Sequence, residues 1–394
     1  MRKFTPVSAA LAVLAVVAVG CGGNASSDKP PSAAQCNDPG VTASQITVGG
    51  IYPQSGQQGG FFKAVGSGVL ARFHAENEAG GVDGRQLKFT TADDGDGELA
   101  NLNAARHLVV DDHVFGVIEG STNSDGSGRF LKEEGVPVTG WGITSAWGQY
   151  KNMFGYRYST SPKPEGEAVT RSAQFVKDRG GKRIGVIAGG ADASINVANQ
   201  FADAVEALGM SVGYKTTDVP LGTTDWGVQV QGLIDGHVDT LYTGMAPTDS
   251  AAIVKAAKAA GMSLKVVLLP AGYDDRFAAA FGKDLEGAYV AVDWRPFELH
   301  VPAHDTFKEN LKAVAPDEFP SQLALVGWLS ADAFIRGLHE AGASCPTRDA
   351  FIDELRKVKD YTANGLVPPT DFGELFGKMP LCFFYVQLHD SHFV

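Results

Sequence analysis

The stretch that decides the fold lies between residues 46 and 94 and contains ITVGGIY (46–52), GSGVLARFHAENEAGG (66–81) and QLKFTTADD (86–94). The first and third segments are short and rich in β-branched residues, which is typical of strands. The middle segment spaces its apolar residues along one face of a helix and ends on two glycines, which commonly terminate helices. The order strand, helix, strand predicts two parallel strands joined by a helical crossover.

The same alternation continues along the chain in two series of segments. The first series adds predicted strands at 114–120 and 136–142 and predicted helices at 98–112 and 124–135. The second series has predicted strands at 182–190, 211–219, 239–245 and 265–272, with helices at 196–208, 228–234 and 249–261. The segment YRYSTSPKPEGEA (156–168) separates the two series. We therefore predict an α/β fold with two doubly wound lobes, each built on a parallel sheet.

The N-terminus has the order of residues of an export signal. Two basic residues precede an apolar run at 7–19, which is too short for a bilayer because a spanning helix takes about 20 residues. Cys21 follows and begins a segment of small and polar residues, an order that resembles the bacterial lipoprotein signal. We expect a signal peptide over 1–20, a lipid on Cys21, and a flexible tether over 21–40 that holds an exported protein at the outer face of the cytoplasmic membrane or in the periplasm. An ordinary secreted chain is the alternative.

Composition excludes some partners. The 394 residues carry a net charge of -12 that is spread along the chain, and 44% of them are hydrophobic, as in ordinary globular proteins. The basic stripe that a phosphate backbone requires is absent, so we expect no nucleic-acid partner. Beyond Cys21 no apolar run approaches 18 residues, and we expect that part of the protein to be soluble.

The remaining cysteines are Cys36, Cys345 and Cys382. An exported protein meets an oxidising environment, so three thiols allow one disulfide and one free cysteine. We favour a bond between Cys345 and Cys382, because Cys36 lies in the expected tether. Spacing alone does not decide connectivity.

Motifs of common catalytic centres are absent from the sequence. It has no nucleophile elbow, no phosphate loop and no dinucleotide-binding glycine motif. His300 and His304 stand four residues apart, but Pro302 interrupts the helix that would align them for a metal. The acidic residues at 93–98 lie at a predicted strand-to-helix turn, and we interpret them as a solvated loop. We expect no enzyme activity, no cofactor and no metal ion.

Candidate binding residues lie in the loops that follow strands, because open α/β sheets bind ligands beyond the carboxyl ends of their strands. GSTNSDG (120–126) offers the hydroxyls of Ser121 and Thr122 and the free N–H groups of a helix start. These groups suit an anionic or carbonyl oxygen. The alternative is that both side chains only cap the helix.

A second candidate loop, GWGITSAWGQY (140–150), is rich in aromatic residues. Its two tryptophans, Trp141 and Trp147, are flanked by small residues, which is a poor setting for complete burial of both. We expect at least one of them to form a wall of a ligand cleft.

Three stretches now carry a family resemblance: GVTASQITVGGIYPQSGQQG (40–59), AENEAGGVDGRQLKFTTADDG (75–95) and ARHLVVDDHVFGVIEGSTN (105–123). They resemble the type I periplasmic binding proteins of the leucine/isoleucine/valine-binding group, the substrate-binding components of ABC importers. The most specific piece is N-x-x-G-G-V-x-G-R at 77–85. The similarity extends over most of residues 41–394.

This resemblance implies two lobes that are joined by three crossovers and close on a small-molecule ligand by hinge motion. It places the crossovers near Ser159, near 293–295 and near Pro368. It also implies a monomer that delivers its ligand to an ABC permease in the membrane. The expected lobes are 41–158 with 294–367, and 159–293 with 368–394.

The resemblance assigns a ligand carboxylate to Ser121 and Thr122, together with Gly142 and Thr144. The family's residues around a ligand ammonium are not kept. A tyrosine is expected where Met245 stands, and the ammonium-binding glutamate is expected where Ala271 stands. A second tyrosine is replaced by small residues around 193.

Asp192, Asp274 or Asp275 could take the place of the missing glutamate. A buried ammonium without a carboxylate costs several kcal/mol, so a pocket that lacks one favours a different ligand. We therefore expect a carboxylate- or carbonyl-bearing ligand with an apolar or aromatic body. The side chains expected around that body are Trp141, Trp147, Met245 and Tyr273.

Two other functions remain as alternatives. The same two-lobed fold serves in ligand sensors, which would have a signalling partner in place of a permease. An exported hydrolase on an α/β scaffold is disfavoured by the missing catalytic motifs.

Overall fold

The structure is a computed structural model of the whole chain, and it describes residues 36, 38–95, 97–158, 171–342, 345–378 and 383–394. The expected signal peptide and the expected lipidation site Cys21 lie outside the described residues. Within the described ranges, the longest apolar helices fall short of what a membrane span requires.

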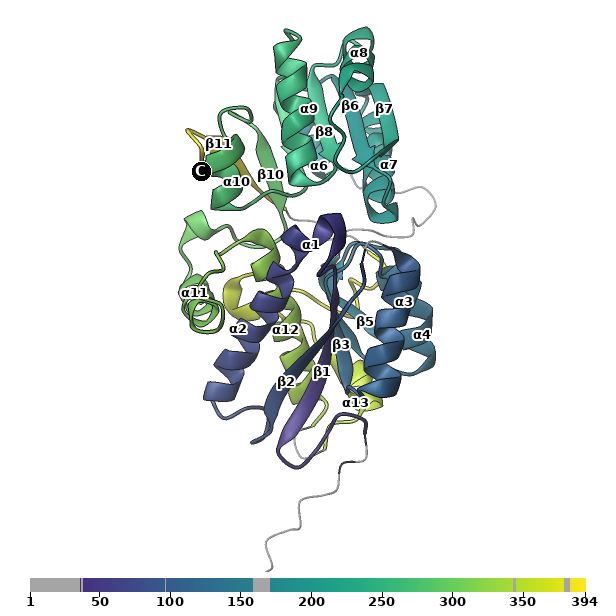
Figure 1. Cartoon of the computed structure of the whole chain (residues 1–394), viewed down its shortest axis with the longest axis vertical. Helices are drawn as coiled ribbons and strands as arrows, with labels where there is room; N and C mark the ends of the chain where they lie inside the picture. The colour runs from purple at the N-terminus through teal and green to yellow at the C-terminus, as the bar shows by residue number, and fades with distance from the viewer. Residues whose placement is uncertain (1–35, 37, 96, 159–170, 343–344, 379–382) are drawn as a thin grey trace, which may run out of the picture. The chain divides into compact units, whose positions relative to one another are not determined.

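The first lobe is built on a five-stranded sheet with the order β2-β1-β3-β4-β5 (Figure 1). All its pairings between neighbouring strands are parallel. Glu119, the last residue of β3, lies opposite Ile51 on one side and Gly140 on the other. The loops after these strands therefore leave the same edge of the sheet. The strands are β1 (Gln45–Tyr52), β2 (Gln86–Asp93), β3 (Gly116–Glu119), β4 (Val138–Gly142) and β5 (Met153–Tyr158).

Helices cover both faces of this sheet, because successive strand residues point to opposite faces. Ile118 packs into one core with α2 and α12, and its neighbour Val117 packs into the other core with α3 and α4. Helix α12 follows the main strands of the other lobe in sequence and returns to the first sheet. The helices of this lobe are α1 (Gly56–Phe62), α2 (Ala64–Glu78), α3 (Glu98–Arg106), α4 (Asp125–Glu133), α5 (Ala146–Gln149), α11 (Pro302–Val314), α12 (Gln322–Glu340) and α13 (Arg348–Leu355).

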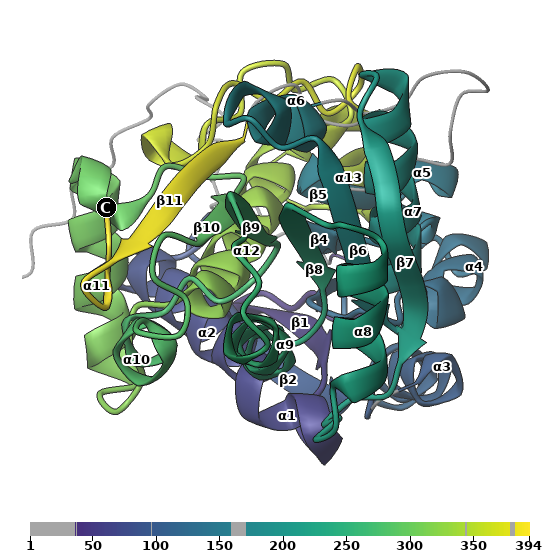
Figure 2. The same cartoon turned by 90° about the horizontal axis from the view of Figure 1, so that it is seen from above.

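The second lobe is built on a sheet with the order β12-β11-β10-β9-β8-β6-β7, and Figure 2 shows β11 to β7 side by side. Strands β6 to β10 pair in parallel, and β11 pairs antiparallel with β10. The strands are β6 (Arg183–Gly189), β7 (Ser211–Val219), β8 (Thr240–Gly244), β9 (Val266–Leu269), β10 (Tyr289–Val292), β11 (Phe384–His389) and β12 (His392–Phe393). The helices are α6 (Arg171–Asp178), α7 (Asp192–Ala207), α8 (Gly227–Asp235), α9 (Pro247–Ala259) and α10 (Asp275–Phe281).

These two sheets confirm the predicted fold class, two α/β lobes on parallel sheets. The chain passes between the sheets after β5, between β10 and α11, and again before β11. The helix predicted over 66–81 is α2, which ends at Glu78 before the paired glycines. The helix predicted over 98–112 is α3 followed by a π-helical turn, His107–Asp111.

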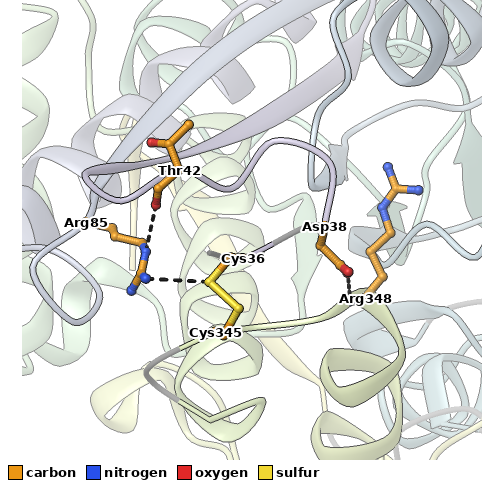
Figure 3. The surroundings of a disulfide bond; sticks show 6 residues. All are labelled: Cys36, Asp38, Thr42, Arg85, Cys345 and Arg348. Carbon is orange, nitrogen blue, oxygen red and sulfur yellow. Dashed lines mark hydrogen bonds between the residues drawn. A yellow bond between two sulfur atoms is a disulfide. The ribbon is translucent and has the colours of Figure 1, made fainter. Parts of the chain in front are cut away.

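The predicted disulfide is wrong in one partner. Cys345 bonds to Cys36, which lies in the segment expected to be a free tether (Figure 3). Asp38 accepts a hydrogen bond from the backbone N–H of Arg348 at 2.6 Å, so the chain just after Cys36 is held on the first lobe beside the α12–α13 connection. The other predicted partner, Cys382, lies outside the described residues.

Candidate ligand-binding site

Ser121, in the loop after β3, is completely buried. Its hydroxyl donates a hydrogen bond to the carboxylate of Asp94, and its oxygen accepts one from the backbone N–H of Asn123 at 2.9 Å. Ser124, and not Ser121 or Thr122, is the residue at the N-cap of α4, and it makes no side-chain cap bond. The hydroxyl of Ser121 therefore holds the loop in place from the inside.

Thr122 differs from its neighbour because it is partly exposed. Its hydroxyl is 3.4 Å from the side-chain oxygen of Gln58 on α1, a long hydrogen bond. Of the two hydroxyls predicted to contact a ligand, that of Thr122 is at the surface of the loop.

The end of β4 and the segment after it contain the other predicted residues of the first lobe. Trp141 is partly exposed, and its ring centroid lies 6.4 Å from that of Phe62. Gly142 and Thr144 are buried. Trp147 is 1% exposed and belongs to the core between the sheet, α3 and α4, so it forms no part of a ligand wall in this structure.

The two loops are fastened to each other by Asp125, the first residue of α4. Its carboxylate accepts hydrogen bonds from the backbone N–H of Ala146 at 2.6 Å and from the hydroxyl of Ser145 at 2.9 Å. Because β3 and β4 are adjacent parallel strands, Thr122 and Trp141 lie at the same edge of the sheet. This edge is the candidate site of the first lobe.

A pair of buried carboxylates lies directly behind this edge, and no sequence pattern predicted it. Asp94 and Glu119 are both completely buried, so the interpretation of the 93–98 segment as a solvated loop is wrong for Asp94. The side-chain amide of Asn101 donates to Glu119 at 2.7 Å and to Asp94 at 3.2 Å. Burial raises the pKa of Glu119 to about 7, and the nearby Asp94 raises it as well.

The second lobe presents its predicted residues after β6, β8 and β9. Asp192 is the first residue of α7, and Met245 comes immediately after β8 and is 8% exposed. Because β6 and β8 are neighbouring parallel strands, the chain positions of Asp192 and Met245 follow the same edge of the sheet.

Tyr273 and Asp274 follow β9, but their polar groups are engaged within the chain. The hydroxyl of Tyr273 donates to Glu298 at 2.6 Å and accepts from the backbone N–H of Phe297 at 2.7 Å. Asp274 caps α10 by accepting from two backbone N–H groups, and it forms an ion pair with Arg276 at 2.9 Å. A pocket of about 50 Å³ beside Asp274 has room for little more than one or two water molecules.

Asp249, in the first turn of α9, is a second carboxylate that sequence reasoning missed. It is 7% exposed, and burial raises its pKa. One of its oxygens accepts from the backbone N–H of Gly222 at 3.0 Å. Within the described part of the chain, Asp249 has no basic side chain at ion-pair distance.

Candidate metal ligands lie elsewhere. Both ring nitrogens of His304 face backbone groups, with Nε2 at 2.9 Å from the carbonyl of Arg295 and Nδ1 at 3.3 Å from the N–H of Val301. Glu286, His389 and Asp390 meet on the surface of the second lobe, and all three are exposed.

Comparison with known proteins is consistent with this architecture. A family model described as "Periplasmic binding protein" matches residues 45–392. The Leu/Ile/Val-binding protein homolog 4 of Brucella abortus is 23% identical over 295 residues, which are 72% of this chain and 69% of the relative. The leucine-binding protein LivK of Thermotoga maritima has a TM-score of 0.73 at 18% identity and covers 89% of this chain and 97% of its own. A fatty acid ABC transporter substrate-binding protein from Thermomonospora curvata has a TM-score of 0.76 at 18% identity and covers 91% of both chains.

Two α/β lobes on parallel sheets, together with the family model that matches residues 45–392, define a solute-binding protein. The chain belongs to the periplasmic binding protein family, as the resemblance of its sequence predicted. Proteins of this family are extracytoplasmic, bind small-molecule ligands and work with ABC transporter permeases; they are not classed as enzymes.

Proposed function

We propose that this protein is the lipid-anchored, extracytoplasmic solute receptor of an ABC importer. Its ligand is a small carboxylate- or carbonyl-bearing metabolite with an apolar or aromatic body. The ligand oxygen contacts the loop of Thr122, and Trp141 lies against the apolar body.

The observation that carries the proposal is the contrast between the two lobes. The first lobe offers the partly exposed Thr122 and Trp141 at one sheet edge. In the second lobe Asp274, one of the residues that could have faced a ligand ammonium, is already engaged in an ion pair with Arg276, and the hydroxyl of Tyr273 is engaged with Glu298. Their engagement supports a ligand without an ammonium group, and the fatty acid receptor is a structural neighbour whose ligand has that chemistry.

A calorimetric screen of the mature protein tests the ligand class. Octanoate, phenylacetate and leucine are suitable probes, because they share a carboxylate and differ in the ammonium group and the apolar body. We expect micromolar binding of octanoate or phenylacetate and none of leucine. Binding of leucine alone contradicts the proposed ligand class and favours the amino-acid alternative, in which the carboxylate of Asp249 takes the ammonium.

Site variants test where the ligand binds. Replacing Thr122 with Val removes one hydrogen bond to a charged oxygen, so we expect affinity to fall by roughly 10- to 100-fold. Thr90→Val is the matched control, because the Thr90 hydroxyl is likewise partly exposed and 3.4 Å from its acceptor, Asp112. Equal affinities of both variants would place the ligand elsewhere.

The anchor and the partner need separate tests. Mass spectrometry of the mature N-terminus is expected to find a diacylglycerol-modified Cys21, and an unmodified N-terminus would favour the ordinary secreted form. A receptor for import stimulates ATP hydrolysis by its permease complex in proteoliposomes only when ligand is present. Failure to do so, combined with ligand-dependent activation of a sensor kinase, would favour the signalling alternative.

A further inference from the structure

Two buried carboxylates lie behind the loop that is proposed to hold the anionic group of the ligand. Glu119 ends β3, two residues before Ser121, and Asp94 follows β2. The two N–H groups of the Asn101 amide are directed at the two carboxylates, at 2.7 and 3.2 Å. The hydroxyl of Ser121 connects Asp94 to the loop itself. A change of charge on Glu119 or Asp94 therefore acts on the loop of Thr122 through the hydroxyl of Ser121.

Electrostatics favours a proton on Glu119. Among the described residues, no basic side chain lies at ion-pair distance from Glu119, and its side chain is completely buried. A completely buried carboxylate beside a second carboxylate is stabilised by taking up a proton. Burial raises the pKa of Glu119 to about 7, so at neutral pH the protonated and ionised forms are present in similar amounts.

One neighbouring charge acts on Glu119 most directly. The carboxylate of Asp94 faces it from the segment after β2 and raises the pKa of Glu119. Helix α3 contributes the uncharged Asn101, and α4 contributes the hydroxyls of Ser124 and Ser127, which lower it. The titration of Glu119 is thus set by its burial, by one neighbouring carboxylate and by neutral hydrogen-bond donors.

We propose that binding of an anionic ligand group at the Thr122 loop is coupled to protonation of Glu119, so that the receptor takes up the ligand anion together with a proton. The proposal rests on the proposed function, which places an anion at this loop. Thr122 is three residues from Glu119, so at about 3.5 Å per residue the two lie within about 10 Å of each other. A new negative charge at that distance from the buried carboxyl of Glu119 favours its neutral form.

The direction of the pH effect follows from linkage. If the anion binds only when Glu119 is protonated, the apparent Kd rises as the protonated fraction falls. With a pKa of about 7, affinity at pH 8 is then about tenfold weaker than at pH 6. At pH 7 each bound anion takes up about half a proton from the buffer.

Calorimetry with the anion probes octanoate and phenylacetate measures the proton directly. Titrations at pH 7 in two buffers of different ionisation enthalpy give the number of protons taken up per ligand. We expect about half a proton for the unaltered protein, and none for Glu119→Gln, whose affinity no longer changes between pH 6 and pH 8. Glu76→Gln is the matched control, because it makes the same side-chain change in the last turn of α2. We expect this variant to leave the proton uptake unchanged.

The outcomes separate the two proposals. Binding of an anion without proton uptake by the unaltered protein overturns the coupling and leaves the proposed function intact. Absence of binding by either anion at any pH overturns both. The decisive measurement uses the unaltered protein, so it remains decisive if Glu119→Gln does not fold.

Discussion

Ser121 and Thr122 are neighbours in the chain, but their hydroxyls have opposite surroundings. That of Ser121 is buried and hydrogen-bonded to Asp94 and Asn123, whereas that of Thr122 is at the surface of the loop. A sequence pattern treats the two hydroxyls as equivalent, but the structure gives them different surroundings. The hydroxyl of Ser121 holds the loop, and that of Thr122 is the one that we propose to contact the ligand.

The difference predicts opposite effects of two substitutions on stability. Ser121→Ala leaves the Asp94 carboxylate without one donor and the N–H of Asn123 without its acceptor, so the free energy of unfolding is expected to fall by about 1–3 kcal/mol. Thr122→Val changes a partly exposed side chain and is expected to remain within about 0.5 kcal/mol of the unaltered protein. Urea denaturation measures both values. Similar losses in the two variants would contradict the assignment of roles.

Glu119 predicts a pH dependence of stability that needs no ligand. Its pKa is about 7 in the folded protein and 4.5 in the absence of burial, so its favourable contribution is fully present below pH 4.5 and is lost as pH rises through 7. Between pH 5 and pH 8 the protein loses about 2.5 kcal/mol of unfolding free energy relative to Glu119→Gln, which cannot ionise. Chemical denaturation of both proteins at pH 5 and pH 8 gives the difference.

Glu133→Gln provides the control for this measurement. The carboxylate of Glu133 is exposed and pairs with Arg129 at 2.9 Å, and the guanidinium of Arg129 stays charged over the whole pH range. The stability difference between Glu133→Gln and the unaltered protein is therefore expected to be constant from pH 5 to pH 8. A flat profile for Glu119→Gln relative to the unaltered protein would show that Glu119 remains ionised throughout.

At the scale of elements, the local pattern of apolar and polar residues was sufficient to predict most strands and helices from the sequence. The alternation of residues in β1 and β3 supplies both cores of the first lobe, and the apolar face of α2 is visible as Val69 and Phe73 in the sequence. Long-range features were not predictable in this way. Asp94 lies in a segment of acidic residues that looks solvated, and only the packing of α3 and α4 against the sheet buries it.

The site was predictable to a similar extent. The loops after β3 and β4 could be found because parallel strands present their carboxyl ends at one edge. The hydrogen bond between Tyr273 and Glu298 could not be found from the sequence, because the two residues lie 25 positions apart and no sequence pattern relates them. The pairing of Cys36 with Cys345 is a still longer-range case, with a sequence separation of 309 between the partners.

The disulfide predicts a loss of stability upon reduction. Because it closes a very long loop, its removal by Cys345→Ser is expected to lower the free energy of unfolding by about 2–5 kcal/mol. Thermal unfolding with and without reductant measures the loss, and the Cys345→Ser variant is expected to be insensitive to reductant. Cys382→Ser distinguishes the two pairings. If this variant and not Cys36→Ser abolishes the effect of reductant, the bond joins Cys345 to Cys382.

At the scale of the whole molecule, the side chain of Gln322 is one of the groups that connect the two lobes, together with the ion pair of Arg276 and Glu318 at 3.4 Å. Gln322 begins α12, which packs on the first sheet, and is 2% exposed. Its side-chain oxygen accepts from the backbone N–H groups of Gly272 at 3.0 Å and Tyr273 at 3.3 Å, in the loop after β9 of the second lobe. Its amide also donates to the carbonyl of Pro270 at 3.3 Å.

These bonds predict that Gln322 makes the two lobes unfold together. Leucine at this position leaves two buried N–H groups without their acceptor, so we expect the free energy of unfolding to fall by about 2–4 kcal/mol. Loss of the connection also uncouples the lobes, and differential scanning calorimetry is expected to show a calorimetric enthalpy larger than the van't Hoff enthalpy. Gln387→Leu is the control, because the amide of Gln387 donates to Gly287 within the second lobe. A single two-state transition in Gln322→Leu, with the same ratio of enthalpies as Gln387→Leu, would show that other contacts couple the lobes.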